Sequence, residues 1–382
     1  MNDPMKAPAA ARQTGSRSGF RLLRGPAALV EAEHAYRYLW ARTDPAPPTL
    51  DYDWVRAWWD LHGDEGTPFL VQLEEDGTPV ALAPLYIRHR EFSRRGALRT
   101  VCFLATGEDT ADEVYGTNNS WLGPSQHHAA LSEAVVEALR ARRGAWDRLW
   151  LSNVGPDRGI VDGLADGLAD QLLAADRIEH SNWVIDLPDS LATFLRDVSG
   201  KKRRSNMRRI LRRVESEGVT HEWITDADDA LEAYEQLADL HTRFWNARGE
   251  AGACASEVFS SFQRTMIRTY ARQGRLWLQR MSLCGQPVAV SLEIEAGGQI
   301  YSYLGGVDPD FNRLSPGGLT VLKVVERAAR KGFESVDLLA GDYGYKHRYA
   351  TRELPVTTWE AFGRTPAARA WTGLRSLRAR IT

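Results

Sequence analysis

The sequence predicts an α/β protein, with a mixed sheet of the α+β kind, built from two similar halves. Apolar segments with strand periodicity alternate with segments of helical periodicity along the chain. The order of these elements in the first half recurs in the second. The hairpin sequence GTPVA at residues 77–81 corresponds to GQPVA at residues 285–289, 208 residues later. A shared hairpin at the same place in the same order indicates an internal duplication.

Composition limits the classes of protein that the chain can represent. Its 382 residues correspond to about two domains, and 43% of them are hydrophobic, which suffices for packed cores. The formal net charge of −2 argues against a protein that coats nucleic acid. Cys102, Cys254 and Cys284 lie far apart, which argues against a disulfide scaffold or a zinc ribbon and predicts a cytoplasmic protein. No apolar run approaches the ~18 residues of a membrane span, and we expect no signal peptide.

The first half follows a leader, residues 1–19, that has no apolar periodicity and is expected to be disordered. Asp51 or Asp53 marks the start of a helix, and the turn sequence Glu75-Asp76-Gly77 predicts a hairpin. In order we expect strand 20–23, helices 27–41 and 51–61, hairpin strands 69–73 and 80–87, strand 98–104, helix 126–143, strand 149–152, helix 160–175 and strand 183–187.

The second half repeats this order after two amphipathic helices within residues 191–217. In order we expect strand 219–224, helices 227–246 and 257–273, hairpin strands 276–281 and 288–294, strand 300–304, helix 316–331, and strands 336–339 and 355–361. The expected domains are therefore residues 20–188 and 189–363. A basic tail, residues 364–382, follows as a helix that either packs one face or binds a membrane surface or a partner.

The segment from 301 to 330 predicts an anion site at the start of a helix. A strand ends at Gly305-Gly306, and Ser315 and Pro316 are natural N-cap and first helical residues. The free N–H groups of such a first turn, here Gly317, Gly318 and Leu319, attract phosphate, and Arg313 adds positive charge. The alternative is a plain strand–loop–helix connection whose glycines allow close packing.

A second candidate site follows the strand expected at 336–339. Asp342, Tyr345, Lys346 and His347 come directly after that strand, and ligands of open α/β sheets bind outside the carboxyl ends of strands. The alternative is that Asp342 caps a following helix and the aromatic side chains pack beneath it. No set of His, Cys and Asp residues has the spacing of metal ligands, so we expect no metal.

These segments together resemble the CelD-like (cellulose biosynthesis) branch of the GNAT acyltransferase superfamily, to which the FemAB-like aminoacyl transferases are related. The resemblance extends over residues 50–362 and is strongest from 200 to 362. It implies two tandem acyltransferase domains that transfer an acyl group, usually from acyl-CoA, to an amine or a hydroxyl. It rests on residues 301–330, 341–350 (GDYGYKHRYA), 240–245 (LHTRFW) with Gly249 and Gly252, the basic helix 203–213, and 79–85 (PVALAPL).

The chain departs from the phosphate loop of ordinary GNAT enzymes at one position. Pro316 stands where that loop has its first glycine, so one phosphate-binding N–H group is missing. The corresponding segment of the first half, residues 104–125, has no Gly-Gly helix start. We therefore expect only the second half to hold an acyl donor, and the donor site of the first half to be degenerate.

The resemblance implies roles for residues of the second half. Asp342, His347 and Glu293 are the candidate bases, although Glu293 can also be read as a solvent-facing strand carboxylate. Tyr345 is a candidate acid for the leaving thiolate, or a core residue. Lys346 holds an acidic group of the donor or acceptor, or pairs with Asp342. Backbone N–H groups near Gly305-Gly306 supply an oxyanion contact.

Two further features point to ligands. His241 and Trp245 lie one turn apart on one face of a helix, where they either line an acceptor cleft or stack in the core. A run of eight cations without an acid is either a solvated face or a site for CoA, an acyl carrier protein or tRNA. The cations are Lys201, Lys202, Arg203, Arg204, Arg208, Arg209, Arg212 and Arg213.

The leading hypothesis is an acyl-CoA-dependent N- or O-acyltransferase that acts on a polar metabolite or a saccharide precursor. A FemAB-like transferase with an aminoacyl-tRNA donor is the second hypothesis; the near-neutral charge and the lack of a long helical hairpin insertion argue against it. A non-catalytic scaffold in exopolysaccharide assembly is the third, with Pro316 marking an inactive donor site.

Overall fold

The structure, a computed structural model, describes residues 18–93, 96–156, 159–197, 200–341 and 345–378. The expected leader, residues 1–19, lies outside this description up to residue 17. The strands are β1 (Ser18–Arg24), β2 (Gly66–Glu75), β3 (Thr78–Ser93), β4 (Gly96–Phe103), β5 (Arg148–Val154), β6 (Leu172–Asp186), β7 (Thr220–Ile224), β8 (Leu276–Leu283), β9 (Gln286–Ala296), β10 (Gln299–Val307), β11 (Ser335–Ala340) and β12 (Arg352–Gly363).

Helices connect these strands in the order that the sequence predicts. The α-helices are α1 (Ala28–Trp40), α2 (Tyr52–His62), α3 (His128–Ala141), α4 (Ile160–Leu168), α5 (Leu191–Asp197), α6 (Lys201–Glu217), α7 (Ala227–Asn246), α8 (Glu257–Arg272), α9 (Pro316–Lys331) and α10 (Pro366–Arg378). Short 3-10 turns are η1 (Pro48–Leu50), η2 (Gly63–Glu65), η3 (Ser125–His127), η4 (Ala169–Gln171), η5 (Ala253–Ala255), η6 (Pro309–Leu314) and η7 (Lys346–Arg348).

The strands of the described residues form one sheet in the order β1-β2-β3-β4-β5-β12-β6-β11-β10-β9-β8-β7. The two halves are equivalent in detail. Strands β4 and β5 pair in parallel, and so do β10 and β11. The two matching hairpin turns share their backbone conformation, with φ of 49° and 79° at Asp76-Gly77 and of 51° and 77° at Cys284-Gly285. This agreement supports the duplication that the repeated sequence indicates.

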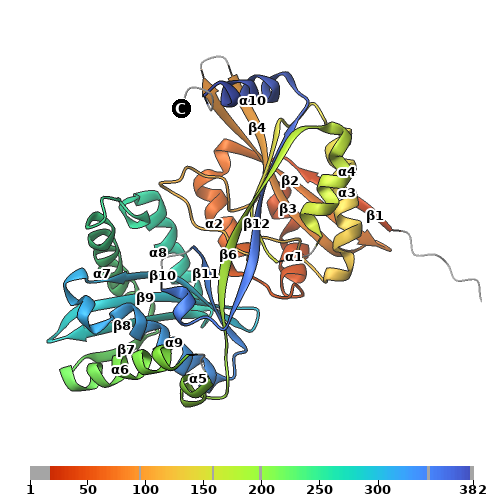
Figure 1. Cartoon of the computed structure of the whole chain (residues 1–382). Coiled ribbons are helices and arrows are strands. Elements are labelled where there is room, and N and C mark those ends of the chain that lie inside the picture. Colours follow the sequence, from red (N-terminus) through yellow and green to blue (C-terminus); the bar gives the residue numbers. More distant parts are fainter. Residues whose placement is uncertain (1–17, 94–95, 157–158, 198–199, 342–344, 379–382) are drawn as a thin grey trace, which may run out of the picture.

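The last strand of each half lies in the sheet of the other half. Strand β12, at the end of the chain, pairs with β5 and β6, and β6 pairs with β12 and β11. Figure 1 shows β6 and β12 as the two long strands that join the lobes. The domain boundary at residue 188 stays a prediction, because the strand just before it completes the sheet of the second half.

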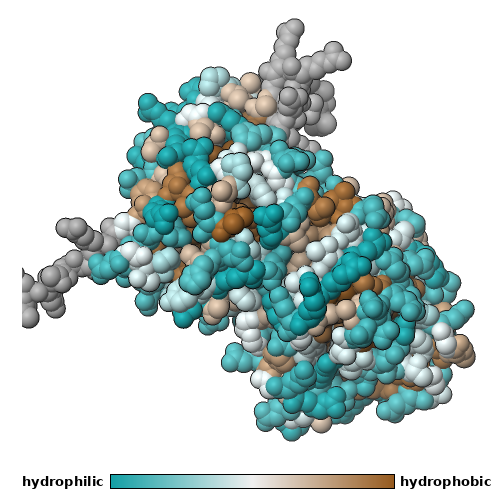
Figure 2. Space-filling view, turned by 180° about the vertical axis from the view of Figure 1, so that it is seen from behind, coloured by the Kyte–Doolittle hydropathy of each residue, from teal (hydrophilic) through white to brown (hydrophobic). Residues whose placement is uncertain are grey.

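Three of the apolar clusters formed by the described residues hold the helices on the sheet. Helices α1, α2, α7 and α8 share one core that includes residues from both halves. On the other face, α3 and α4 cover the strands of the first half, and α5, α6 and α9 cover those of the second. The surface seen in Figure 2 is mostly hydrophilic, with apolar side chains in scattered patches. Among the described residues no helix is both long and apolar enough to cross a membrane.

Two neighbouring predictions are wrong: the end of the helix expected at 160–175 and the start of the strand expected at 183–187. The expected helix over 160–175 ends at Leu168, and the chain enters β6 at Leu172. The apolar spacing of 160–168 continues far enough to suggest a longer helix. The backbone from Leu172 instead forms hydrogen bonds with β12, a strand about 180 residues later, and local periodicity carries no information about such a partner.

Candidate functional site

The parallel strands β10 and β11 separate at their carboxyl ends. They pair only at Ile300–Val336 and Tyr301–Asp337. Beyond these pairs β10 has an irregularity against β9 between Ser302 and Leu304, and β11 has one against β6 after Asp337. The sheet therefore opens a fork in its second half, and the ends of parallel strands are where α/β proteins bind ligands.

Asp337 anchors the base of this fork. Its Oδ2 accepts hydrogen bonds from Asn118 Nδ2 at 2.8 Å and Asn182 Nδ2 at 2.9 Å, and its Oδ1 accepts one from the backbone N–H of Leu339 at 2.7 Å. Burial raises the pKa of Asp337, while these hydrogen bonds oppose the shift. Because Asn118 belongs to the first half, the base of the fork is built by both halves.

Among the predicted site residues that the structure describes, Lys346 is the one that donates to the end of β11. Its Nζ donates to the carbonyl oxygens of Leu339 at 3.2 Å and Ala340 at 2.7 Å, and the residue is buried. Burial lowers the pKa of Lys346 to about 8, while the nearby Asp337 carboxylate raises it. Its suggested partner Asp342 lies outside the described residues, so that pairing and the catalytic role of Asp342 stay predictions.

Helix α9 begins at the residue that the sequence predicts, but the expected side-chain cap is absent at Ser315. Ser315 precedes Pro316 in a left-handed conformation, with φ of 53°, and its side chain makes no cap hydrogen bond. The Ser315 carbonyl accepts from the N–H groups of Gly318 at 3.0 Å and Leu319 at 3.1 Å. The N–H of Gly317 receives no side-chain cap, so it is the donor that the first turn keeps for a ligand.

The segment after β11 lies against the start of α9. A Cβ atom at Gly318 would lie 2.2 Å from the Tyr349 hydroxyl, so only glycine fits there. Tyr345 and His347 are exposed in the same segment, and the His347 ring lies 6.3 Å from the Trp183 ring. The two motifs found in the sequence are therefore neighbours in space.

The Arg313 guanidinium is already engaged in an ion pair. It pairs with Glu217 of α6, and the Arg313 carbonyl accepts a hydrogen bond from Arg213. The basic helix α6 is thus attached beside the start of α9. A ligand phosphate would have to compete with Glu217 for Arg313.

His241 and Trp245 lie on the opposite face of the sheet, on α7. Trp245 Nε1 donates to His241 Nε2 at 3.0 Å, and burial lowers the pKa of His241 to about 4. The imidazole is therefore neutral at pH 7, with its proton on Nδ1. A Cβ atom at Gly306 would lie 2.9 Å from the His241 backbone nitrogen, which places this pair beside the end of β10. Gly305-Gly306 thus packs on α7, and an oxyanion contact there stays a prediction.

Glu293 is not at the fork. It lies on β9 under α9 and is 1% exposed, so its interpretation as a solvent-facing carboxylate is wrong. Its Oε1 accepts from Ser291 Oγ at 2.6 Å and from Gln279 Nε2 at 3.4 Å. Burial raises the pKa of Glu293 to about 8. A protonated carboxyl group accepts no proton, so Glu293 could serve as a base only in more alkaline solution.

The sequence assigned no role to the loop between β4 and α3, yet this loop covers the fork from the first half. Tyr303, at the irregularity of β10, donates its hydroxyl to the Val114 carbonyl at 2.7 Å. Ser256, the N-cap of α8, donates to Asp112 at 2.5 Å. Polar composition marked the segment only as a loop, and its partners are more than 140 residues away.

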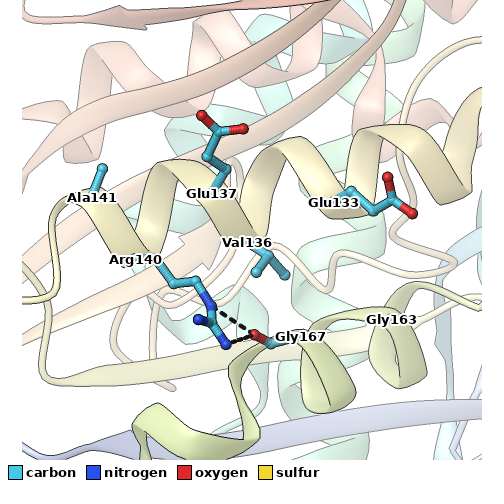
Figure 3. Close-up of a pocket in the computed structure, with 7 residues that line it drawn as sticks. All are labelled: Glu133, Val136, Glu137, Arg140, Ala141, Gly163 and Gly167. Carbon is cyan, nitrogen blue, oxygen red and sulfur yellow. Dashed lines mark hydrogen bonds between the residues drawn. The ribbon is translucent and has the colours of Figure 1, made fainter.

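One surface groove among the described residues lies elsewhere. A groove of about 360 Å³ runs between α3 and α4, lined by Glu133, Val136, Glu137, Arg140, Ala141, Gly163 and Gly167. Figure 3 shows Arg140 of α3 bonded to the Gly167 carbonyl of α4 across it. None of the predicted site residues lines this groove. No group of three or more His, Cys, Asp or Glu side chains within the described ranges is arranged to hold a metal ion.

The comparisons with known proteins bear on the fold. Residues 201–347, from the start of α6 to η7, match the family model of the acetyltransferase (GNAT) domain. No sequence match was found among curated proteins. Three solved structures align over most of both chains, and the two with TM-scores of 0.50 or more show the fold alone.

FemX has a TM-score of 0.59 at 12% identity, covering 90% of this chain and 98% of its own. A protein of unknown function from Bacteroides thetaiotaomicron VPI-5482 has a TM-score of 0.50 at 10% identity, covering 87% and 97%. A tandem GNAT protein from the clavulanic acid biosynthesis pathway has a TM-score of 0.45 at 12% identity, covering 91% and 100%. The predicted fold class is confirmed: the chain is a mixed α/β protein of two GNAT-like halves, and residues 201–347 of the second half match the GNAT domain model.

Proposed function

We propose that the chain transfers an acyl group from acyl-CoA to an amine or a hydroxyl of a polar metabolite or a saccharide precursor in the cytoplasm. The observation that carries the proposal is the fork between β10 and β11 beside the uncapped first turn of α9. The match of residues 201–347 to the GNAT domain supports the reaction class. The CelD-like branch and its link to polysaccharide synthesis stay proposals from the sequence resemblance.

The donor binds on the α9 side of the sheet in this proposal. The N–H group of Gly317 faces the phosphates, and the positive end of the α9 dipole adds to the attraction. The N–H groups of Gly318 and Leu319, which donate to the Ser315 carbonyl, would have to exchange that acceptor for the ligand. The pantetheine arm then enters the fork. The Lys346 amine, which is half protonated near pH 8, lies at the end of β11. The acyl carbonyl of the donor would be placed at the same end of this strand.

The acceptor enters from the α7 side. The acceptor nitrogen or oxygen attacks the thioester carbon, the C–S bond breaks, and the acceptor's proton ends on the departing thiolate. Tyr345 is the proposed proton donor to that thiolate, with Asp342 or His347 as the base that first takes the acceptor's proton. His241 carries its proton on Nδ1 and is neutral, so it can orient an acceptor oxygen through a hydrogen bond but takes up no proton at pH 7.

The donor site is tested by the variant Gly317→Glu. A Cβ atom at Gly317 would meet only Val307, at an ordinary contact distance of 3.5 Å, so a side chain can start there without a clash. The new carboxylate is compatible with a helix N-terminus but repels phosphate. We expect acetyl-CoA, measured by titration calorimetry, to bind at least tenfold more weakly than to the control Gly317→Gln, which has the same length without the charge.

Two results would contradict the proposal. Equal affinities of the two variants for acetyl-CoA would mean that its phosphates do not bind at the start of α9. Failure of a panel of acyl-CoA esters to raise the melting temperature of the unaltered chain would remove the donor altogether, because a ligand that binds only the folded state must stabilise it. That second result would favour the scaffold hypothesis.

A FemAB-like aminoacyl transferase is the second candidate function. The fold likeness to FemX, at a TM-score of 0.59, favours it, and the basic helix α6 could bind tRNA. Retention of the chain on immobilised tRNA that is lost as salt rises, without binding of acetyl-CoA, would select this candidate.

A further inference from the structure

Helix α6 presents a stripe of five exposed cations, hereafter the α6 stripe. An α-helix turns about 100° per residue and rises about 1.5 Å, so these side chains lie within about 120° of arc and extend over about 16 Å. The same helix buries Met207 and Ile210 on its other side. The stripe consists of Lys201, Lys202, Arg208, Arg209 and Arg212.

The charge of the α6 stripe is not compensated within the described part of the chain. No carboxylate lies within 4 Å of any of its five cations; Arg209 bonds to Asn206 and Arg212 to the Arg208 carbonyl. Some other helical arginines of this protein are paired with carboxylates, as Arg264 is with Glu235 and Glu257. Like charges one turn apart, such as Arg208 and Arg212, destabilise a helix slightly. In a chain of net charge −2, such a concentration calls for an anionic partner.

The α6 stripe borders the donor site. Ile210 Cδ1 lies 3.3 Å from where a Cβ atom of Gly318 would be, and Arg213 bonds to the Arg313 carbonyl. On the next turns toward the N-terminus, Arg203 donates to the carbonyls of Arg348 at 2.9 Å and Ala350 at 3.0 Å. Figure 1 shows α6 alongside α9 at the outside of the second lobe. A partner on the stripe would therefore stand next to the start of α9.

The dimensions of the α6 stripe favour a small acidic protein. The phosphates of CoA itself are too compact to contact cations over about 16 Å. The apolar side of α6 is buried against α9, so the helix has no free apolar face that could insert into a lipid surface. Nucleic acid carries phosphates at short, regular intervals over a length greater than that of the stripe. The exposed acids Asp197 and Glu215 flank the stripe at its two ends, so they would repel a polyanion that extends past it.

We propose that the α6 stripe docks the acidic face of an acyl carrier protein, whose phosphopantetheine arm then delivers the acyl group to the fork. This inference rests on the proposed function and names the partner of its donor site. The transfer balances as it does with CoA: the carrier's C–S bond breaks, the acyl carbon bonds to the acceptor, and the acceptor's proton ends on the carrier thiol. The acidic face of a carrier protein would contact all five cations of the α6 stripe, whereas a free CoA ester would contact only some of them.

The test measures binding of a fluorescently labelled holo-acyl carrier protein to the full chain at low and moderate salt. The variant Arg208→Glu/Arg212→Glu reverses two charges of the stripe. Its matched control is Arg268→Glu/Arg272→Glu on α8, an exposed pair with the same spacing and the same arginine-to-carbonyl contact. We expect the α6 variant to bind at least tenfold more weakly, the control to bind within twofold of the unaltered chain, and salt to weaken binding.

Each other result decides against the carrier. Equal losses in both variants would mean that net charge alone attracts it, and absence of binding to every form would overturn the inference outright. Binding of bulk tRNA, or of vesicles containing phosphatidylglycerol, that the α6 variant alone loses would assign the stripe to that partner when the carrier does not bind.

Acetyl-CoA calorimetry on the same proteins separates this inference from the proposed function. Acetyl-CoA that binds all forms equally, together with a carrier that binds none, would leave the proposed function in place and remove the docking. A carrier that binds through the α6 stripe to a chain without affinity for acetyl-CoA would keep the docking and remove CoA as the donor. Matching melting temperatures of the two variants serve as the control for folding.

Discussion

At the scale of single residues, Glu293 shows how burial decides a chemical role. Alternation along β9 assigns Glu293 and Ser291 to one face of the sheet, but only the packing of α9 makes that face interior. The carboxyl group gives up its hydration on burial, and its two hydrogen bonds, both to Oε1, only partly offset that loss, so its pKa rises to about 8. The same residue on an exposed face would be an ordinary carboxylate.

The variant Glu293→Gln tests this. Between about pH 4.5 and pH 8 the folded state holds a proton that the unfolded state has released, so the free energy of unfolding falls as the pH rises through this window. Over the whole window the loss amounts to about 5 kcal/mol. Glutamine mimics the protonated acid and does not titrate. Urea unfolding should show nearly equal stabilities at pH 5 and a clearly more stable variant at pH 9.

Two outcomes would contradict it. Stabilities of the two proteins that run parallel from pH 5 to pH 9 would mean that Glu293 is ionised in the folded state. A large loss of stability in the variant at pH 5 would mean that the amide cannot replace the acid between Ser291 and Gln279.

At the scale of elements, α2 is tied to the second half through its N-cap. Asp51 caps α2 by accepting from the Asp53 N–H at 3.1 Å and also forms a buried ion pair with Arg275, just before β8. Arg275 in turn lies 5.1 Å from the centre of the Trp40 ring. One carboxylate therefore starts a helix of the first half and neutralises a cation of the second.

We expect Asp51→Ala to lower the free energy of unfolding by about 3–5 kcal/mol, because it removes the cap and leaves the Arg275 charge without its partner. Asp51→Asn keeps a good cap and loses only the ion pair, so it should lose less. Denaturant titration measures both.

The matched control is Asp226→Ala, which removes an exposed N-cap of α7 that has no ion pair among the described residues. It should lose about 1 kcal/mol. If Asp51→Ala lost no more than Asp226→Ala, the ion pair between the halves would contribute nothing to stability.

At the scale of the whole molecule, the exchanged strands make the two halves interdependent. Without β12, strand β5 becomes an open edge with unpaired backbone groups, and the same holds for β11 without β6. The core shared by α1, α2, α7 and α8 adds an apolar surface that neither half can bury alone.

We therefore expect fragments 1–188 and 189–382 to aggregate or remain unfolded when each is produced alone, and to assemble when they are produced together. A full chain with a protease site after Asp189 should stay associated after cleavage and melt in one transition. Circular dichroism and size-exclusion chromatography measure both. A cooperative melt of either fragment by itself would contradict the interdependence.

The sequence by itself determined the elements and the motifs. Helices α7 and α9 have the bounds that periodicity and capping residues predict, and the hairpins lie where the turn residues place them. Local interactions decide such features: helical hydrogen bonds span four residues, and turn conformations depend on two. The same locality made the start of α9 and the segment from Tyr345 to His347 visible as candidate sites.

Only the tertiary structure decided how the halves share strands, that the loop before α3 covers the fork, and that Glu293 is buried whereas the α6 stripe is exposed. These outcomes depend on pairings between residues as far apart as Asn118 and Asp337, which are separated by 219 positions. The free energy of such contacts comes from burial and hydrogen bonding in the assembled chain. No pattern within a single segment encodes it, because the partner lies in another segment.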